Sequence, residues 1–168
     1  MTNPEVLLIG VGNEYCGDDG AGLAVVRALK TRKLPPAVRL LEAEMCDGAS
    51  LLSLWRAQSQ VILIDAVSSG APAGTIYRFD ALAQPLPANL CFRSTHGFGV
   101  ADALALAYTL NQIPFALLVY AIEGQNFTAH IGLSPEVEKA VQVASEQICQ
   151  MVSLWCTQDM PASLMDGE

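Results

Sequence analysis

The chain has 168 residues, of which 52% are hydrophobic and 15% are charged, and its formal net charge is −8. This length and composition predict one folded domain with a sizeable core, and they exclude disorder over most of the chain. The excess of 17 acidic over 9 basic residues argues against a nucleic-acid partner, because phosphate contacts need clustered Lys and Arg.

The cysteines are odd in number and include no C-x-x-C pair, so we expect neither a disulfide framework nor a thiolate zinc site. We interpret them as small, mostly buried hydrophobic residues in a reducing environment. The N-terminus carries no basic segment and only a short apolar run, which argues against a signal peptide. No apolar stretch approaches the ~18 residues that a membrane span needs, so we expect a cytoplasmic protein without membrane association.

The first half of the chain alternates apolar runs with helical patterns. Val6–Ile9 predicts a strand buried on both faces, and a glycine-rich loop leads from it into a helix that ends near Lys33. A second strand is predicted over Val38–Leu41 and a short helix over residues 48–55. A central strand is predicted over Val61–Ile64, which is again wholly apolar.

The second half is predicted to complete the sheet. Residues Thr75–Phe79 alternate between polar and apolar, as an edge strand does, and a proline-containing loop follows through Asn89. A helix is predicted from near His96 to about Asn111. The last buried strand is predicted over Ala116–Ile122.

The clearest periodicity marks a closing helix that begins at Pro135, with Ser134 as its predicted N-cap. Its apolar residues recur at helical spacing and predict one buried stripe: Val137, Ala140, Val141, Ala144, Ile148, Met151, Val152 and Trp155. Strands alternating with helices predict a single three-layer α/β/α domain over residues 1–157, with a mostly parallel, twisted sheet of about five strands. Residues 158–168 are predicted to form a short, acidic, mobile tail.

In such a sheet, ligands bind beyond the carboxyl ends of the strands. This rule indicates three places, which are the loop after Ile9, the residue after Ile64 and the loop after Ile122. Asp19 and Asp65 lie at the first two of them. We therefore expect a site at this edge.

The glycine-rich loop after the first strand fits neither common phosphate-binding pattern. Tyr15 stands where a dinucleotide fingerprint needs its last glycine, and no Gly-Lys-Ser/Thr follows. Asp18 and Asp19, at the start of the next helix, would repel a phosphate. Either acid could simply be the N-cap of that helix; alternatively, one caps while the other points outward to bind a cation.

Asp65 directly follows an apolar strand, where a charge is costly unless it is paired or bound to a metal. It is therefore a salt-bridge or turn-capping residue, or else a ligand. His96 is likewise structural or ligating, and His130 is a competing candidate that we interpret as a packing or partner-contact residue. Together, Asp19, Asp65 and His96 would make a three-ligand metal site with open positions that suits zinc or nickel.

Three further acids each have two interpretations. Asp102 could orient the loop around His96 or face solvent. Glu123 could line a groove for a substrate peptide or cap a turn, and Glu14 has the same ambiguity.

Four segments in this order resemble the hydrogenase maturation protease family: LLIGVGNEYCGDDGAG, VILIDAV, STHGFGVADAL and IGLSPEVEKA. The resemblance spans roughly Val6 to Val152. It implies a hydrolase, an aspartyl-type endopeptidase that removes a C-terminal peptide from the precursor of the nickel–iron hydrogenase large subunit. That precursor is then the expected partner, and we expect the protein itself to be a monomer.

The resemblance also implies that Asp19, Asp65 and His96 are the metal-contacting residues, although some members have Glu where Asp19 stands. The implied metal is nickel presented by the substrate, with zinc or cadmium as alternatives in the isolated protein. In one mechanism, contact with the precursor's nickel aligns the scissile bond, and a polarised water or an acid such as Asp18 assists attack. In the other, the three residues hold their own metal, which activates a water.

Two other functions share features with this sequence. A peptidyl-tRNA hydrolase shares the strand leading into a Gly-x-Gly-Asn loop, but it predicts a basic groove and a histidine soon after that loop; here no histidine precedes His96. A chaperone-like protein that binds the precursor or nickel without cleavage would keep the same three residues, so the sequence leaves that alternative open.

Overall fold

Six strands form one mixed, mostly parallel sheet in this computed structural model, which describes residues 5–44, 48–55, 59–93 and 100–157. The strands are β1 (Val6–Gly12), β2 (Val38–Glu44), β3 (Gln60–Ser68), β4 (Ile76–Asp80), β5 (Cys91–Phe92) and β6 (Ala116–Glu123). The helices are a short 3-10 helix η1 (Gly17–Gly20), α1 (Ala21–Leu29), α2 (Gly48–Leu52), α3 (Val100–Thr109) and α4 (Pro135–Cys156).

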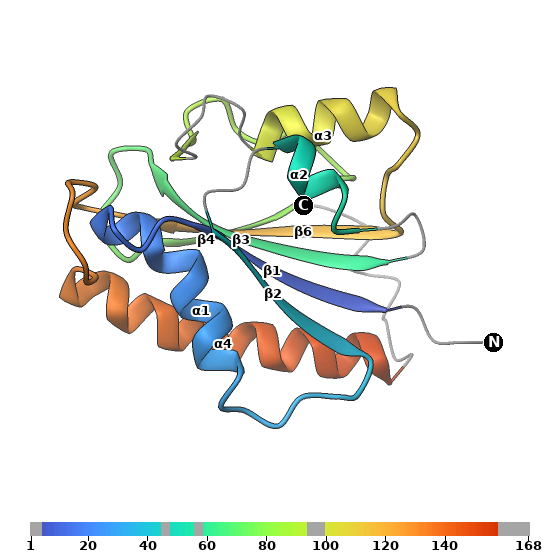
Figure 1. The fold of residues 1–168 in the computed structure, drawn as a ribbon, viewed down its shortest axis with the longest axis horizontal. Coiled ribbons are helices and arrows are strands. Elements are labelled where there is room, and N and C mark those ends of the chain that lie inside the picture. The colour runs from blue at the N-terminus through green and yellow to red at the C-terminus, as the bar shows by residue number, and fades with distance from the viewer. Residues whose placement is uncertain (1–4, 45–47, 56–58, 94–99, 158–168) are drawn as a thin grey trace.

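Helices cover both faces of the sheet, which confirms the three-layer α/β arrangement. Figure 1 shows the sheet almost edge-on, with α1 and α4 on one side and α2 and α3 on the other. Successive residues of a strand point to opposite faces, so Leu8 of β1 packs with α1 and α4, whereas Ile9 packs with α2 and α3. Each strand in the middle of the sheet therefore has to be apolar on both faces.

The predicted stripe of the closing helix is confirmed, since all eight of its residues are buried in α4. The prediction for Ser134 is only half right. Ser134 occupies the N-cap position of α4, but its side chain makes no capping hydrogen bond. Its hydroxyl instead donates to Asp18 Oδ2 at 2.7 Å, a residue 116 positions earlier in the chain.

The sheet differs from the predicted one by an added strand. The two residues of β5 pair antiparallel with Val67 and Ser68 of β3, in the stretch between Asn89 and His96 for which the sequence predicts no element. A two-residue strand has no periodicity that a sequence could display. β4 is an antiparallel edge strand beside β6, as its alternating pattern predicts.

The centre of the sheet opens at Asp65. The ladder between β1 and β3 ends with the pair Gly10↔Ile64, and the β5–β3 ladder begins only at Val67. On the other side, β6 stays paired with β3 through Val67. Asp65 therefore lies inside β3 rather than at its end, which corrects the prediction, and it occupies the gap between β1 and β5.

Several predictions fall outside the described residues. These include His96, which lies in the segment 94–99, and the tail at 158–168. The four described cysteines are free, but none is fully buried and Cys91 is exposed, so the interpretation of the cysteines as mostly buried is wrong for them. In the part of the chain that the structure describes, no helix has the length and apolar character needed to cross a membrane.

Candidate active site

Asp65 is a buried carboxylate in the middle of the sheet. Its side chain is 1% exposed, and its Oδ1 accepts a hydrogen bond of 2.8 Å from the N–H of Ala66. Oδ2 is buried and has no hydrogen-bond partner among the described residues. A salt bridge, the structural alternative for Asp65, is not found among those residues.

Asp19 reaches the same place from the loop after β1. It lies in η1, is 2% exposed, and has a buried Oδ1 with no partner in the described part of the chain. Gly22 lets the following helix approach closely, because a Cβ there would lie 2.3 Å from the carbonyl oxygen of Ile64. The start of α1 is thus pressed against the strand residue that precedes Asp65.

Burial raises the pKa of both carboxylic acids, and the charge of Asp19 also acts on Asp65. Burial raises the pKa of Asp19 to about 6, although the N–H of Asn13 and the charge of Arg93 act in the opposite direction. Burial, and then the negative charge of Asp19, raise the pKa of Asp65 well above its usual value. Both effects disfavour the ionised form of Asp65.

Asp18 directly precedes Asp19, but its surroundings stabilise the ionised carboxylate. Its Oδ2 accepts hydrogen bonds from the N–H groups of Gln125 and Asn126 and from the Ser134 hydroxyl, and its Oδ1 accepts one from the Ser134 N–H. Burial acts to raise the pKa of Asp18, but these hydrogen bonds outweigh it and the pKa is lowered. Neither Asp18 nor Asp19 caps α1, whose N-cap is Gly20.

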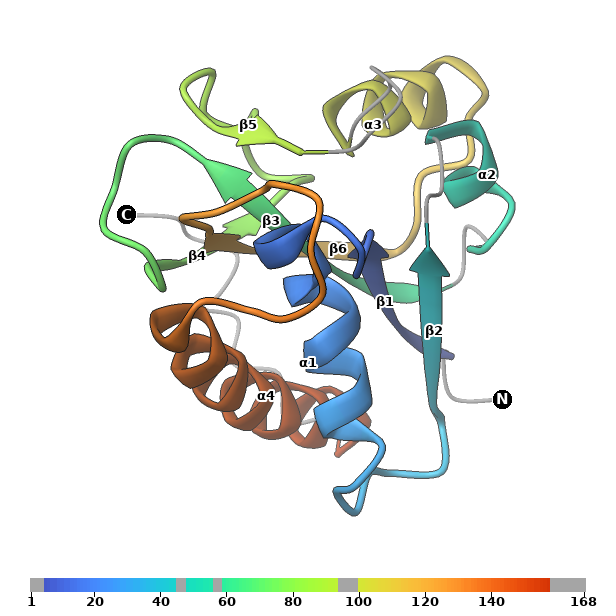
Figure 2. The ribbon, with the colours of Figure 1, turned by 60° about the vertical axis from the view of Figure 1, so that its left-hand side comes forward.

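The loop between β6 and α4 is tied down over the site by these contacts. Gly17, which has a positive φ of 59°, donates its N–H to the carbonyl of His130, and Asp18 donates to the carbonyl of Asn126. Figure 2 shows this loop crossing the beginning of α1. His130 is exposed, but its ring lies beside Gly17, where a Cβ would be 2.6 Å from its Cε1.

The other candidate acids have structural roles or lie on the surface. Glu123 is buried and accepts hydrogen bonds from the N–H groups of Ser69 and Gly70 and from the Ser69 hydroxyl, so it caps a turn. Glu14 forms an ion pair of 2.9 Å with Arg27. Asp102 is exposed on α3.

Of the three predicted metal ligands, the structure describes two, Asp19 and Asp65. Among the described residues, no group of three His, Cys, Asp or Glu side chains is placed to hold a metal ion. The third predicted member, His96, lies outside those residues, in the segment that leads into α3. Asp65 points to the α2 and α3 face, because it alternates in register with Val61 and Leu63.

Arg93 is a site residue that no pattern in the sequence indicates. It follows β5, its N–H donates to the carbonyl of Ala66, and its guanidinium lies 4.4 Å from the centre of the Phe127 ring. The only feature of the sequence that could have indicated Arg93 is its place three positions before His96, as a basic residue in an acidic chain.

A family model and curated relatives give consistent matches to this chain. A family model described as "Hydrogenase maturation protease" matches residues 23–151. The hydrogenase 2 maturation protease of Escherichia coli is 31% identical, over 85% of this chain and 87% of the relative. A hydrogenase expression/formation protein of Azotobacter vinelandii is 30% identical, over 89% and 75% respectively.

A solved structure resembles this chain in fold and, at lower similarity, in sequence. The structure of a hydrogenase maturating endopeptidase from E. coli matches with a TM-score of 0.74 and 28% identity, covering 89% of this chain and 92% of that one. The fold of this chain agrees with that structure. The chain belongs to the hydrogenase maturation protease family and is a peptidase.

Proposed function

We propose that this peptidase removes the C-terminal extension of a nickel–iron hydrogenase large-subunit precursor after nickel has been inserted. Asp19, Asp65 and His96 contact the nickel that the precursor carries, so the metal is part of the substrate. The observation that carries the proposal is the pair of buried, mutually repelling carboxylates with unpartnered oxygens. The cytoplasmic location and the monomeric state stay predictions.

A divalent cation fits this pair for electrostatic reasons. The unpartnered Oδ1 of Asp19 and Oδ2 of Asp65 are buried, and among the described residues no hydrogen-bond donor satisfies them. A dication would neutralise both charges, and burial strengthens its attraction to them. Carboxylate oxygens together with an imidazole are ligands that borderline ions such as nickel and zinc accept.

The chain's own residues then bind, orient and exchange a proton. Contact with the nickel would favour the ionised form of Asp65, because a coordinating carboxylate has to be ionised, and so would offset the effect of burial. Asp65 is held by a strand that pairs with β6 beyond it, and Asp19 by a helix pressed against β3. Such rigid placement of the metal would fix the nearby peptide bond for attack by water. The positive charge of the nickel helps to polarise the groups that react.

Asp18 is not proposed as the acid that assists attack. Both of its oxygens already accept hydrogen bonds, and it is completely buried. Its lowered pKa favours an ionised carboxylate that cannot donate a proton near neutral pH. We assign it instead to holding the loop between β6 and α4 in place beside Asp19.

The test is a processing assay with metal-stripped enzyme and purified precursor, prepared with and without nickel. We expect the nickel-loaded precursor to lose its C-terminal peptide, as mass spectrometry would show, and the nickel-free precursor to stay intact. Asp19→Asn and Asp65→Asn should abolish processing. Glu14→Gln is the matched control, since it neutralises a surface acid of the same loop.

The other outcomes identify the alternatives. Efficient cleavage of nickel-free precursor by enzyme resupplied with zinc would show that the protein uses its own metal, and nickel sensing would be wrong. Stable co-elution with the nickel-loaded precursor, without any shortening, would indicate a binding chaperone.

A further inference from the structure

Arg93 forms no ion pair with an acidic side chain among the described residues, although its charge acts on Asp19 at longer range. The ion pairs found there take up Arg27, Lys30 and Arg39, all on the α1 and β2 side of the sheet. Arg93 is exposed, and its guanidinium stacks on the ring of Phe127. Its guanidinium donors are therefore free for a ligand, as far as the described residues show.

The position of Arg93 is defined even though it is exposed. The backbone is fixed beside Asp65, because β5 pairs with β3 and the Arg93 N–H donates to Ala66. The guanidinium lies within the ~6 Å range of a cation–π contact with Phe127. Phe127 packs against Gly124, close to the Cβ of Asp18, so it belongs to the loop held over the site.

We propose that Arg93 is a specificity-determining residue that binds a carboxylate of the substrate peptide. The inference rests on the proposed function, since the peptide is the precursor's C-terminal segment. The planar fork of a guanidinium matches a carboxylate, and stacking on an aromatic ring orients that fork before the ligand arrives. The carboxylate belongs either to an acidic side chain near the scissile bond or to the terminus of the extension.

The surrounding charge makes this contact selective. The protein has a net charge of −8, and Asp19 and Asp65 lie at the same edge, so a peptide carboxylate is repelled from most of this surface. Arg93 provides a local exception, and its charge already acts on Asp19. A substrate carboxylate bound there would be kept apart from the two buried acids and off the nickel contact.

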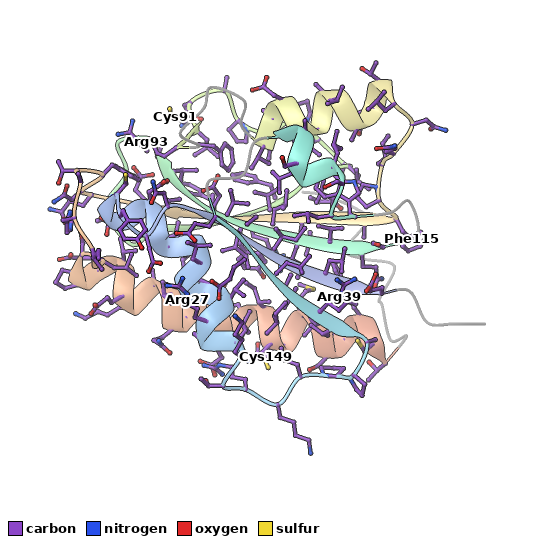
Figure 3. All side chains as sticks on the ribbon, viewed as in Figure 1. Arg27, Arg39, Cys91, Arg93, Phe115 and Cys149 are labelled. Atoms are coloured by element: carbon purple, nitrogen blue, oxygen red, sulfur yellow. The ribbon has the colours of Figure 1, made fainter. Side chains whose placement is uncertain are left out.

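The test compares Arg93→Gln, Arg93→Lys and wild type on nickel-loaded precursor. Losing a charge-assisted hydrogen bond should raise KM about five- to tenfold for Arg93→Gln, with kcat within about twofold. Arg93→Lys keeps the charge but loses the planar fork and its stacking, so it should recover only part of the loss, and Phe127→Leu should cause a smaller rise in KM than Arg93→Gln. Arg39→Gln is the matched control, because Arg39 lies at the opposite end of the molecule (Figure 3).

Substrate variants identify the carboxylate and expose a wrong assignment. In one precursor variant the acidic side chains near the cleavage point are neutralised, and in the other the C-terminus is lengthened. We expect the variant that removes or displaces the bound carboxylate to raise the wild-type KM. With that substrate, Arg93→Gln should cause no further loss. An unchanged KM for Arg93→Gln, or a loss that persists on every carboxylate-free substrate, would overturn the inference.

Calorimetric binding of uncleaved precursor separates this inference from the proposed function. If wild type binds the precursor but never shortens it, the proposed function fails. A higher Kd for Arg93→Gln than for wild type would still support the contact. Equal Kd values for the two proteins would overturn it.

Discussion

Asp18 and Asp19 are neighbours whose neutralisation should change stability in opposite directions. Burial raises the pKa of Asp19 from 3.8 to about 6, so keeping it ionised costs the folded protein up to about 3 kcal/mol. The folded pKa lies above the unfolded value, so this cost is absent below about pH 4, grows between pH 4 and 6, and is complete above pH 6. Asp19→Asn should therefore raise the free energy of unfolding by about 1–3 kcal/mol at pH 7.5 and leave it nearly unchanged at pH 4.

Asp18→Asn should do the reverse. Its carboxylate accepts hydrogen bonds from two backbone N–H groups of one segment and from both the N–H and the hydroxyl of Ser134. An amide nitrogen would face donors where an oxygen now accepts. Because hydrogen bonds to a charged group are worth about 1.5–3 kcal/mol, we expect a loss of about 2–4 kcal/mol at pH 7.5.

The assay is urea unfolding followed by circular dichroism at several pH values from 4 to 7.5. Glu14→Gln serves as the control, since losing an exposed ion pair should change stability by less than about 1 kcal/mol. A loss of stability in Asp19→Asn at pH 7.5, or a gain that does not depend on pH, would refute the assignment of Asp19 as a strained, buried carboxylate.

Three further predictions concern the pH profile, the close packing of α1 and the core. Processing should decline as the pH falls below about 6, because a proton on Asp19 then competes with the metal; a flat profile of kcat/KM from pH 5 to 8 would contradict this. Gly22→Ala should prevent stable folding, since its Cβ would lie 2.3 Å from a β3 carbonyl oxygen, whereas Gly70→Ala, with no atom within 4 Å and a φ of +87°, should cost only about 1 kcal/mol. Thermal unfolding compares the two variants, and equal melting temperatures would be inconsistent with that packing. Ile148→Ala removes a fully buried side chain of α4 and should cost about 2–4 kcal/mol in urea unfolding, so a loss below about 1 kcal/mol would mean that α4 is loosely packed.

Much of the fold is readable from the sequence, because burial repeats with the local geometry of each element. The apolar runs of β1, β3 and β6 and the stripe of α4 mark residues that are buried in the structure. The same logic indicates the carboxyl edge of the sheet as the site. Asp19 follows the end of β1, whereas Asp65 lies inside β3 just beyond the last β1 pair; both are buried, and the charge of Asp19 acts on Asp65.

The sequence by itself therefore determined the layers, the strand cores and the edge where the acids lie. Only the tertiary structure decided which of the two adjacent aspartates has hydrogen-bond donors for both carboxylate oxygens, because the donors to Asp18 come from residues 107 to 116 positions away. The two-residue β5 and the placement of Asp65 inside β3 likewise depend on pairing between distant segments. Hydrogen bonds of this kind leave no periodic trace in a sequence, since one donor and one acceptor suffice to make them. Burial leaves such a trace, because it requires a whole face of a helix or strand to be apolar.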